Sequence, residues 1–143
     1  MSETATEALR GGDRIQLSFP ARGDLIVLAR LVTSAVSARA GFDIEELEDL
    51  RLAVGELCLL TLEGSDEGQG DLCLELTVLA EAIGVECTLA GATGAASAPG
   101  GNGNETAQLS VQILDALVDE HGRERQDDSV RAWLRKRRGG HAA

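Results

Sequence analysis

Apolar and polar residues alternate in several short stretches of the chain, a pattern that predicts strands with one buried face. These stretches cover residues 15–19, 72–78, 83–89 and 129–135. Pro20 ends the first of them. Only a short link at 80–82 separates the second stretch from the third, so we expect these two strands to form an antiparallel hairpin.

Three other stretches carry apolar residues three or four positions apart, the spacing typical of helices. The first is expected to start at Asp24, which can cap it, and to end near Ala40. The second covers 43–63, with Asp43 as N-cap and Glu46 at the third helical position, the pattern of a capping box. The third is predicted over 107–120.

The first predicted helix has two different sides. Its apolar side is expected to face the core and consists of Leu28, Val32, Ala35 and Val36. Its polar side is expected to face solvent and consists of Arg30, Ser34 and Ser37, spaced four and three apart. Such a division is typical of a helix at the surface of a globular domain.

The predicted order is strand, helix, helix, strand, strand, helix, strand. It indicates an α+β two-layer sandwich, with a mixed, mostly antiparallel sheet and helices on one face. The 143 residues leave room for one domain. We expect that domain at 14–137, after a flexible leader at 1–13. A mobile Gly-rich loop at 91–104 interrupts it and a basic tail at 138–143 follows it.

The charge balance narrows the classes of partner. Asp and Glu number 24 against 13 Lys and Arg, a net charge of −11, which argues against a general nucleic-acid binder. The acidic turn 43–49 is interpreted mainly as stabilising its helix. No stretch approaches the ~20 apolar residues of a membrane span. Residues 1–10 lack the apolar segment of a signal peptide, so we expect a cytoplasmic protein.

The cysteines are Cys58, Cys73 and Cys87. They lie in apolar patterns and form no Cys-x-x-Cys pair, so they are expected to be buried, reduced thiols. The sequence offers too few further ligands for a zinc site, and no metal is expected.

The run AGFDIEELEDLRLAVGELCLL, residues 40–60, resembles the second helix of the anti-sigma-factor serine kinases. These proteins belong to the GHKL (histidine-kinase-like) ATPase superfamily and act as switches in sporulation and the general stress response. The resemblance extends to Arg30, to Leu-Val-Asp-Glu at 117–120 and to VRAWLRKR at 130–137. It spans roughly residues 15–137 and implies the same two-layer fold.

The resemblance also implies a function. Members of this family bind a sigma factor and are released from it by an anti-anti-sigma protein of the STAS type. Many phosphorylate a serine of that antagonist with ATP, and they commonly dimerise. The family's Arg at the position of Arg30 contacts both partners, so Arg30, Ser34 and Ser37 are candidate partner-binding residues. An ordinary solvated Arg30 is the alternative.

The ATP site that the resemblance implies is incomplete in this chain. Glu56 stands at the general-base position, but Leu60 replaces the Asn that holds Mg²⁺ one helical turn later. The adenine-reading Asp-x-Gly-x-Gly segment is here 90–94, Ala-Gly-Ala-Thr-Gly, which keeps only Gly94. Gln108-Leu109-Ser110 stands where the family has a phosphate-binding Gly-x-Gly. Gly100, Gly101 and Gly103 are an alternative but precede the predicted helix start by several residues.

These residues predict an anti-sigma factor without efficient ATP chemistry, in which Glu56 is a remnant of a catalytic base. No cofactor is expected, and weak binding of ATP with Mg²⁺ is the alternative. The alternative function is an active serine/threonine protein kinase that phosphorylates the anti-anti-sigma factor. A regulatory domain for some other protein is the third possibility, and the resemblance allows a homodimer in each case.

Overall fold

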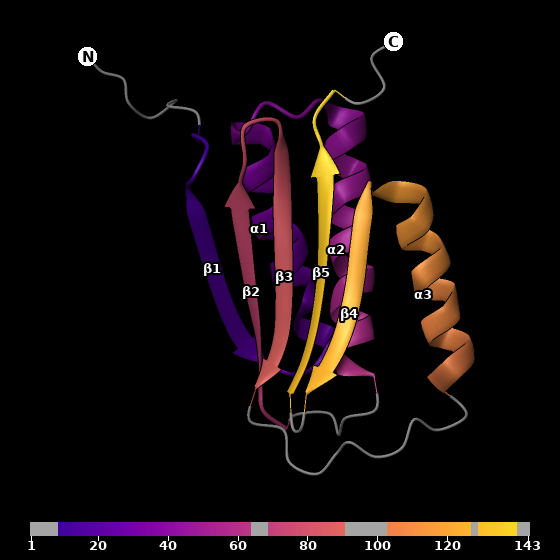
Figure 1. The fold of residues 1–143 in the computed structure, drawn as a ribbon. Helices are drawn as coiled ribbons and strands as arrows, with labels where there is room; N and C mark the ends of the chain where they lie inside the picture. The colour runs from indigo at the N-terminus through magenta and orange to yellow at the C-terminus, as the bar shows by residue number, and fades with distance from the viewer. Residues whose placement is uncertain (1–8, 64–68, 91–102, 127–128, 140–143) are drawn as a thin grey trace.

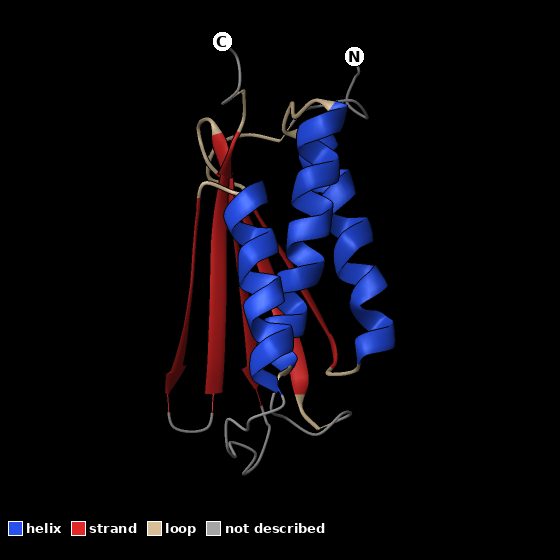
Figure 2. Cartoon of the chain, turned by 90° about the vertical axis from the view of Figure 1, so that its right-hand side faces the viewer, coloured by secondary structure: helices blue, strands red, loops and turns tan. Residues whose placement is uncertain are grey.

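A computed structural model describes residues 9–63, 69–90, 103–126 and 129–139. Within these ranges the chain forms two layers, a five-stranded sheet and a set of helices that all cover the same sheet face (Figures 1 and 2). The elements in chain order are β1 (Arg14–Pro20), the short 3-10 helix η2 (Gly23–Leu25), α1 (Ile26–Arg39), α2 (Ile44–Leu62), β2 (Asp71–Val78), β3 (Ala82–Ala90), α3 (Gly103–Leu117), β4 (Glu120–Gln126) and β5 (Ser129–Arg137). The predicted α+β sandwich is confirmed.

The strands follow the order β1-β2-β3-β5-β4, and every neighbouring pair is antiparallel, so the described sheet is not mixed as predicted. The predicted hairpin is β2–β3, in which Leu74 pairs with Cys87 and Leu76 pairs with Val85. Those four side chains are buried beneath the helices. The intervening residues face the uncovered side of the sheet, because successive strand residues point to opposite faces.

The helices lie over different parts of the sheet. α1 packs on α2 and β2, α2 packs on β3 and β5, and α3 packs on α2 and β4. In Figure 2 the helices lie together on one side of the sheet, with α2 between its two neighbours. No helix in the described part of the chain is long and apolar enough to cross a membrane.

The strand β4 was not predicted, and α3 differs from the predicted helix at both ends. α3 begins at Gly103 and ends at Leu117, and the chain then turns directly into β4. The sequence of β4, EHGRERQ, has no apolar alternation, and none of its described side chains belongs to the hydrophobic core. Its backbone pairs with β5 along its whole length, and two ion pairs also join the strands: Arg131 Nη1 lies 2.6 Å from Glu124 Oε2, and Arg135 Nη2 lies 2.5 Å from Glu120 Oε2.

The predicted orientation of α1 is wrong. Its buried residues are Ile26, Ala29, Thr33, Val36 and Ser37, whereas Leu28 and Ala35 are exposed and Val32 is half-buried. The hydroxyl of Thr33 is satisfied there, because Oγ1 donates to the carbonyl oxygen of Ala29 at 2.8 Å. Asp24 lies in η2, pairs with Arg22 and does not cap α1.

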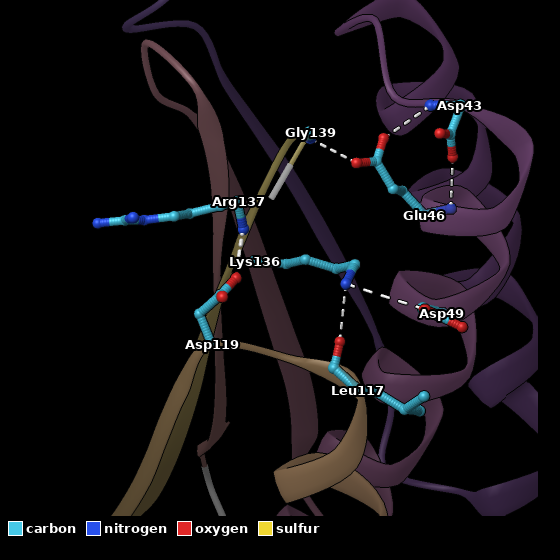
Figure 3. A network of polar contacts seen from close by, with 8 residues as sticks. All are labelled: Asp43, Glu46, Asp49, Leu117, Asp119, Lys136, Arg137 and Gly139. Atoms are coloured by element: carbon cyan, nitrogen blue, oxygen red, sulfur yellow. Dashed lines mark hydrogen bonds and ion pairs between the residues drawn. The ribbon is translucent and has the colours of Figure 1, made fainter. Parts of the chain in front are cut away.

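The start of α2 is as predicted. Asp43 Oδ1 accepts a hydrogen bond from the backbone N–H of Glu46 at 2.8 Å, and Glu46 Oε1 accepts one from the N–H of Asp43 at 2.9 Å. Figure 3 shows that the other carboxylate oxygen of Glu46 accepts from the N–H of Gly139. The capping box therefore also ties the end of β5 to α2.

Lys136 strengthens the same junction. Its Nζ donates to the carbonyl oxygen of Leu117 at 2.9 Å and lies 3.9 Å from Asp49 (Figure 3). The first residues after β5 are also hydrogen-bonded to the domain. Arg138 N–H donates to the carbonyl oxygen of Glu81, and Gly139 N–H donates to a carboxylate oxygen of Glu46. Residues 140–143 of the predicted tail, 1–8 of the predicted leader and most of the predicted loop 91–104 lie outside the described residues.

Candidate functional site

Glu56, the predicted catalytic-base position, lies on the side of α2 that faces α3. Ser110, in the middle of α3, donates a hydrogen bond from Oγ to Glu56 Oε1 at 2.7 Å. Ser110 is buried and Glu56 is half-buried. One oxygen of the carboxylate is therefore engaged by the neighbouring helix. A general base must instead reach the proton of the attacking hydroxyl.

Leu60 lies one helical turn after Glu56 and belongs to the hydrophobic core, with 3% of its side chain exposed. It offers no oxygen to a hard cation such as Mg²⁺, which prefers oxygen ligands. No group of three or more His, Cys, Asp or Glu side chains with metal-site geometry occurs among the described residues.

The Gly-rich elements are only partly described. Ala90 ends β3 and is exposed, whereas Gly91, Gly94, Gly100 and Gly101 lie outside the described residues. Gly103 is the first residue of α3. The expectation that Gly103 stands far from the helix start is therefore wrong, because α3 begins several residues earlier than its apolar pattern predicted. Ser110 correspondingly lies inside the helix, not in a turn before it.

The side chain of Arg30, on α1, lies against α2 at Gly55. A Cβ atom added to Gly55 would come within 2.6 Å of Arg30 Nε and 2.7 Å of Nη2, so the guanidinium occupies the space that a side chain would fill. Arg30 is half-buried in this position. Within the described part of the chain it forms no ion pair and no hydrogen bond. Its guanidinium therefore lies against the backbone of α2 without a counter-ion from the described residues.

The polar side of α1 is not a solvent-facing stripe. Ser37 is fully buried, and its Oγ has no hydrogen-bond partner among the described residues. Ser34 is half-buried. Both serines follow Arg30 on the side of α1 that turns toward α2, because residues three and four apart share a helix face. Ser37 has no surface to offer a partner, which leaves Arg30 and Ser34 as candidates.

Two of the cysteines form a buried pair beside this region. Cys58 on α2 and Cys87 on β3 are fully buried, and their Sγ atoms lie 4.0 Å apart. The hydrogen bond with Cys87 and burial raise the pKa of the Cys58 thiol well above its ordinary value, and the charge of Arg30 opposes this shift. Both thiols are free, as predicted.

Cys73 is exposed, so the prediction that all three thiols are buried is wrong. It alternates with Leu72 and Leu74 on β2 and therefore faces the uncovered side of the sheet. There it lines a hollow of about 420 Å³ together with Ser18 and Thr88. Ser18 Oγ lies 3.7 Å from Cys73 Sγ.

Sequence reasoning missed two residues that shape the site, Gly55 and Ser110. A glycine inside a helix costs roughly 1 kcal/mol relative to alanine, so Gly55 carried a signal of close packing. Nothing in the sequence identified Ser110 as the partner of Glu56, because the two residues are joined only by the packing of α3 on α2.

No family model matches this chain. Over 59 residues it is 37% identical to the serine-protein kinase RsbW of Listeria monocytogenes serotype 4a (strain HCC23), which is 41% of this chain and 38% of the relative. It is 33% identical over 70 residues to RsbW of Bacillus pumilus (strain SAFR-032), 46% of this chain and 43% of the relative. It is 28% identical over 75 residues to RsbW of Bacillus subtilis (strain 168), which is 51% of this chain and 47% of the relative.

These relatives confirm the resemblance to the RsbW-like serine-protein kinases. The matches span less than half the length of each relative.

Proposed function

We propose that this chain is an anti-sigma factor of the partner-switching type, which binds a sigma factor and is released from it by a STAS-type anti-anti-sigma protein. The observation that carries the proposal is Arg30. It is held half-buried on Gly55, with no ion-pair partner in the part of the chain that the structure describes, at the position where the resemblance places a contact with both proteins. The relatives named RsbW support the same class of function.

Arg30 suits this role physically. Its planar guanidinium presents several N–H donors that match a carboxylate, and such a pair is stronger than a neutral hydrogen bond. A fixed side chain also loses less conformational freedom when a partner binds. If a sigma factor and its antagonist both pair with Arg30, the two cannot bind at once, and competition follows from that shared contact.

We further propose that the chain works without efficient ATP chemistry. Phosphoryl transfer depends on positioning and on neutralising the charge that develops on the phosphates. Leu60 lies in the core where a metal-binding Asn would be needed, and Glu56 Oε1 already accepts the hydroxyl of Ser110. In this chain Glu56 serves to join α2 and α3.

An active serine/threonine protein kinase is the second candidate. It is favoured by the start of α3 at Gly103, because a glycine at a helix N-terminus lets backbone N–H groups approach a phosphate. The relatives' name, serine-protein kinase, points the same way. In that case Ser110 would have to release Glu56 when ATP and the substrate serine bind.

Affinity capture from the native host, read by mass spectrometry, tests the proposed function. The wild-type chain should capture a sigma factor and a STAS protein. Arg30→Ala should weaken the binding of each protein by ~1–3 kcal/mol of binding free energy. The melting temperature of Arg30→Ala should stay nearly unchanged, since no ion pair is lost. Calorimetry with Mg²⁺ and ATP separates the two candidates, because only the kinase gives heat. Capture of neither protein would instead favour a regulatory domain for another partner.

Location and assembly follow from the same proposal. A protein that withholds a sigma factor from RNA polymerase works in the cytoplasm. The resemblance allows a homodimer, and sedimentation of the purified chain over a range of concentrations measures it.

A further inference from the structure

Two thiols face each other where the helical layer meets the sheet. Cys58 lies on α2 and Cys87 lies on β3, 29 positions further along the chain, and their Sγ atoms are 4.0 Å apart. Neither side chain is exposed to solvent. The proposed function uses neither thiol, so the pair is a feature of the core that still lacks a role.

The two sulfur atoms are already close to bonding distance. A disulfide requires them to approach to about 2.05 Å, so the gap must close by about 2 Å. Strand pairing places Cys87 between Leu74 and Ala132, which are buried on the same, helix-covered face of the sheet. Rotation between staggered rotamers of the two cysteines can supply a movement of this size. The bond therefore does not require the two layers to come apart.

The third thiol cannot take the place of either partner. Cys73 precedes Leu74 on β2, so its side chain points to the face of the sheet opposite to that of Cys87. It is exposed there, whereas Cys58 and Cys87 lie in the hydrophobic core. Of the three thiols, only Cys58 and Cys87 can form an intramolecular disulfide in the folded chain.

The two buried thiols differ in how readily they ionise. The hydrogen bond with Cys58 lowers the pKa of the Cys87 thiol, although burial opposes this shift. The same contact raises the pKa of the Cys58 thiol, and the positive charge of Arg30 acts against that rise. Because the thiolate is the form of cysteine that attacks, Cys87 is suited to react first and Cys58 to remain protonated as the second thiol.

We propose that Cys58 and Cys87 are a redox-active pair, which a peroxide converts into an intramolecular disulfide between α2 and β3. The thiolate sulfur of Cys87 attacks one oxygen of hydrogen peroxide, the O–O bond breaks, and hydroxide leaves. The thiol of Cys58 then attacks the sulfur of this sulfenic acid, the S–S bond forms, and water leaves. Overall the two thiols lose two electrons and two protons, and one peroxide becomes two water molecules.

Burial decides which oxidant suits the pair and how fast it acts. Both thiols are fully buried, so a peroxide reaches Cys87 only during local openings between α2 and β3. A small uncharged molecule uses such openings more easily than a bulky disulfide, which must align its sulfur atoms with the attacking thiolate. Oxidation of the pair should therefore be slower than oxidation of the exposed Cys73.

A disulfide at this place would restrain the helix that carries the candidate site. Gly55 and Glu56 lie within one helical turn of Cys58 on α2. A covalent link to β3 suppresses the openings that separate α2 from the sheet, and it also constrains the unfolded chain. The redox state would then determine how freely α2 moves, whichever partner the chain binds, so this inference does not depend on the proposed function.

The test uses the full chain carrying Cys73→Ser, which leaves the two buried cysteines and changes only an exposed side chain. The reduced, folded protein is treated with millimolar hydrogen peroxide, denatured in N-ethylmaleimide and cleaved after glutamate. This cleavage places Cys58 in the peptide 57–63 and Cys87 in the peptide 87–105. Mass spectrometry should find these two peptides joined in most of the protein, with the loss of two hydrogens, and dithiothreitol should separate them.

Alanine variants in the same background test the two chemical roles. In Cys58→Ala, oxidised Cys87 has no second thiol, so dimedone should trap its sulfenic acid. In Cys87→Ala, dimedone should label Cys58 at least tenfold more slowly. Alanine keeps both core positions apolar, and a melting curve of each variant shows that it folds. Equal labelling of the two variants would overturn the assignment of Cys87 as the attacking thiol.

Three further results decide on the pair and on its effect. If Cys58 and Cys87 stay free under conditions that oxidise Cys73 of the wild-type chain completely, they are inert core thiols and the proposal is wrong. A cross-link that forms only in urea concentrations that unfold the chain also overturns it. Hydrogen exchange of amides in α2 should slow about tenfold on oxidation, and an unchanged rate would show that the disulfide does not restrain the helix.

Discussion

Two buried serines on the helices differ in what their hydroxyl groups do. Ser110 Oγ on α3 donates to Glu56 Oε1 at 2.7 Å, whereas Ser37 Oγ on α1 has no partner among the described residues. A buried hydrogen bond to a charged group stabilises the fold, while a buried hydroxyl without a partner costs free energy. The same residue type therefore has opposite effects at the two positions.

Alanine at each serine tests this contrast. Ser110→Ala should lower the free energy of unfolding by about 1–2 kcal/mol, because Glu56 is left half-buried without its donor. Ser37→Ala should be neutral or should raise it by up to about 1 kcal/mol, since it removes an unsatisfied hydroxyl and improves helix propensity. Urea unfolding measures both. An equal loss in the two variants would show that Ser110 does not hold Glu56.

The three thiols should differ in reactivity. Cys73 is exposed, so a thiol-specific chromogenic reagent should modify one of the three cysteines quickly in the folded chain and all of them in denaturant. Cys58 should be unreactive when folded, because it is buried and its raised pKa keeps it protonated, whereas the thiolate is the reactive form. Cys73→Ser should remove the fast reaction. Fast modification of two thiols in the native chain would contradict the placement of Cys58 and Cys87.

At the scale of single residues, the family resemblance identified Glu56, Leu60 and Arg30 as candidate site positions. It could not find the contact of Arg30 with Gly55 or that of Glu56 with Ser110. Both contacts join residues far apart in the chain, and each depends on how a helix is rotated about its axis. Local spacing does not fix that rotation when, as in α1, the two sides of a helix differ little in polarity.

Among the elements, α2 was predicted best because its start is specified locally. Asp43 and Glu46 are close in sequence, and their mutual hydrogen bonds need no other element. The additional bond from Gly139 N–H to Glu46 was not predictable, since it forms only when β5 lies beside α2.

Replacement of Glu46 should show this double role. Glu46→Ala removes the acceptor of both Asp43 N–H and Gly139 N–H and should destabilise the fold by about 2 kcal/mol. Glu45→Ala, in the same first turn but exposed, is the matched control and should cost less than about 0.5 kcal/mol. Thermal and urea unfolding measure the difference. Equal effects would show that the bonds of Glu46 contribute nothing beyond its charge near the helix N-terminus.

The elements that the sequence misplaced share a physical cause. β4 is held by backbone pairing with β5 and contributes no described side chain to the hydrophobic core, so it shows no apolar alternation. α1 buries Ala29, Thr33 and Ser37, small residues that do not stand out as a hydrophobic side. In both cases contacts with other elements determine the structure. The sequence-based rules use hydrophobicity and could not detect those contacts.

On the scale of the whole molecule, the fold class followed from the order of elements and one hairpin, because few topologies accommodate that order. The two outer surfaces nevertheless differ in a way that only the structure shows. On the uncovered sheet face, arginines pair with glutamates, such as Arg14 with Glu75 at 3.2 Å and Arg131 with Glu86 and Glu124. On the helical layer Arg51 pairs with Glu48, whereas Arg30 has no such partner among the described residues.

Nucleotide chemistry is a property of the whole fold, because an ATP site would join α2, the end of β3 and the start of α3. We expect the wild-type chain to give no heat with Mg²⁺ and ATP at high micromolar concentration. Leu60→Asn should not create kinase activity, since Ala90 still lacks the adenine-reading carboxylate that the resemblance implies.

Leu60→Asn should also lower the free energy of unfolding by roughly 2–4 kcal/mol, because it places an amide in the core position of a side chain that is 3% exposed. Leu59→Asn, at the exposed neighbouring position, controls for the loss of helix propensity and should cost much less. Transfer of radiolabelled phosphate to the captured antagonist measures activity in all three proteins. Phosphorylation by the unmodified chain would establish the kinase, and it would mean that Ser110 releases Glu56 during the reaction.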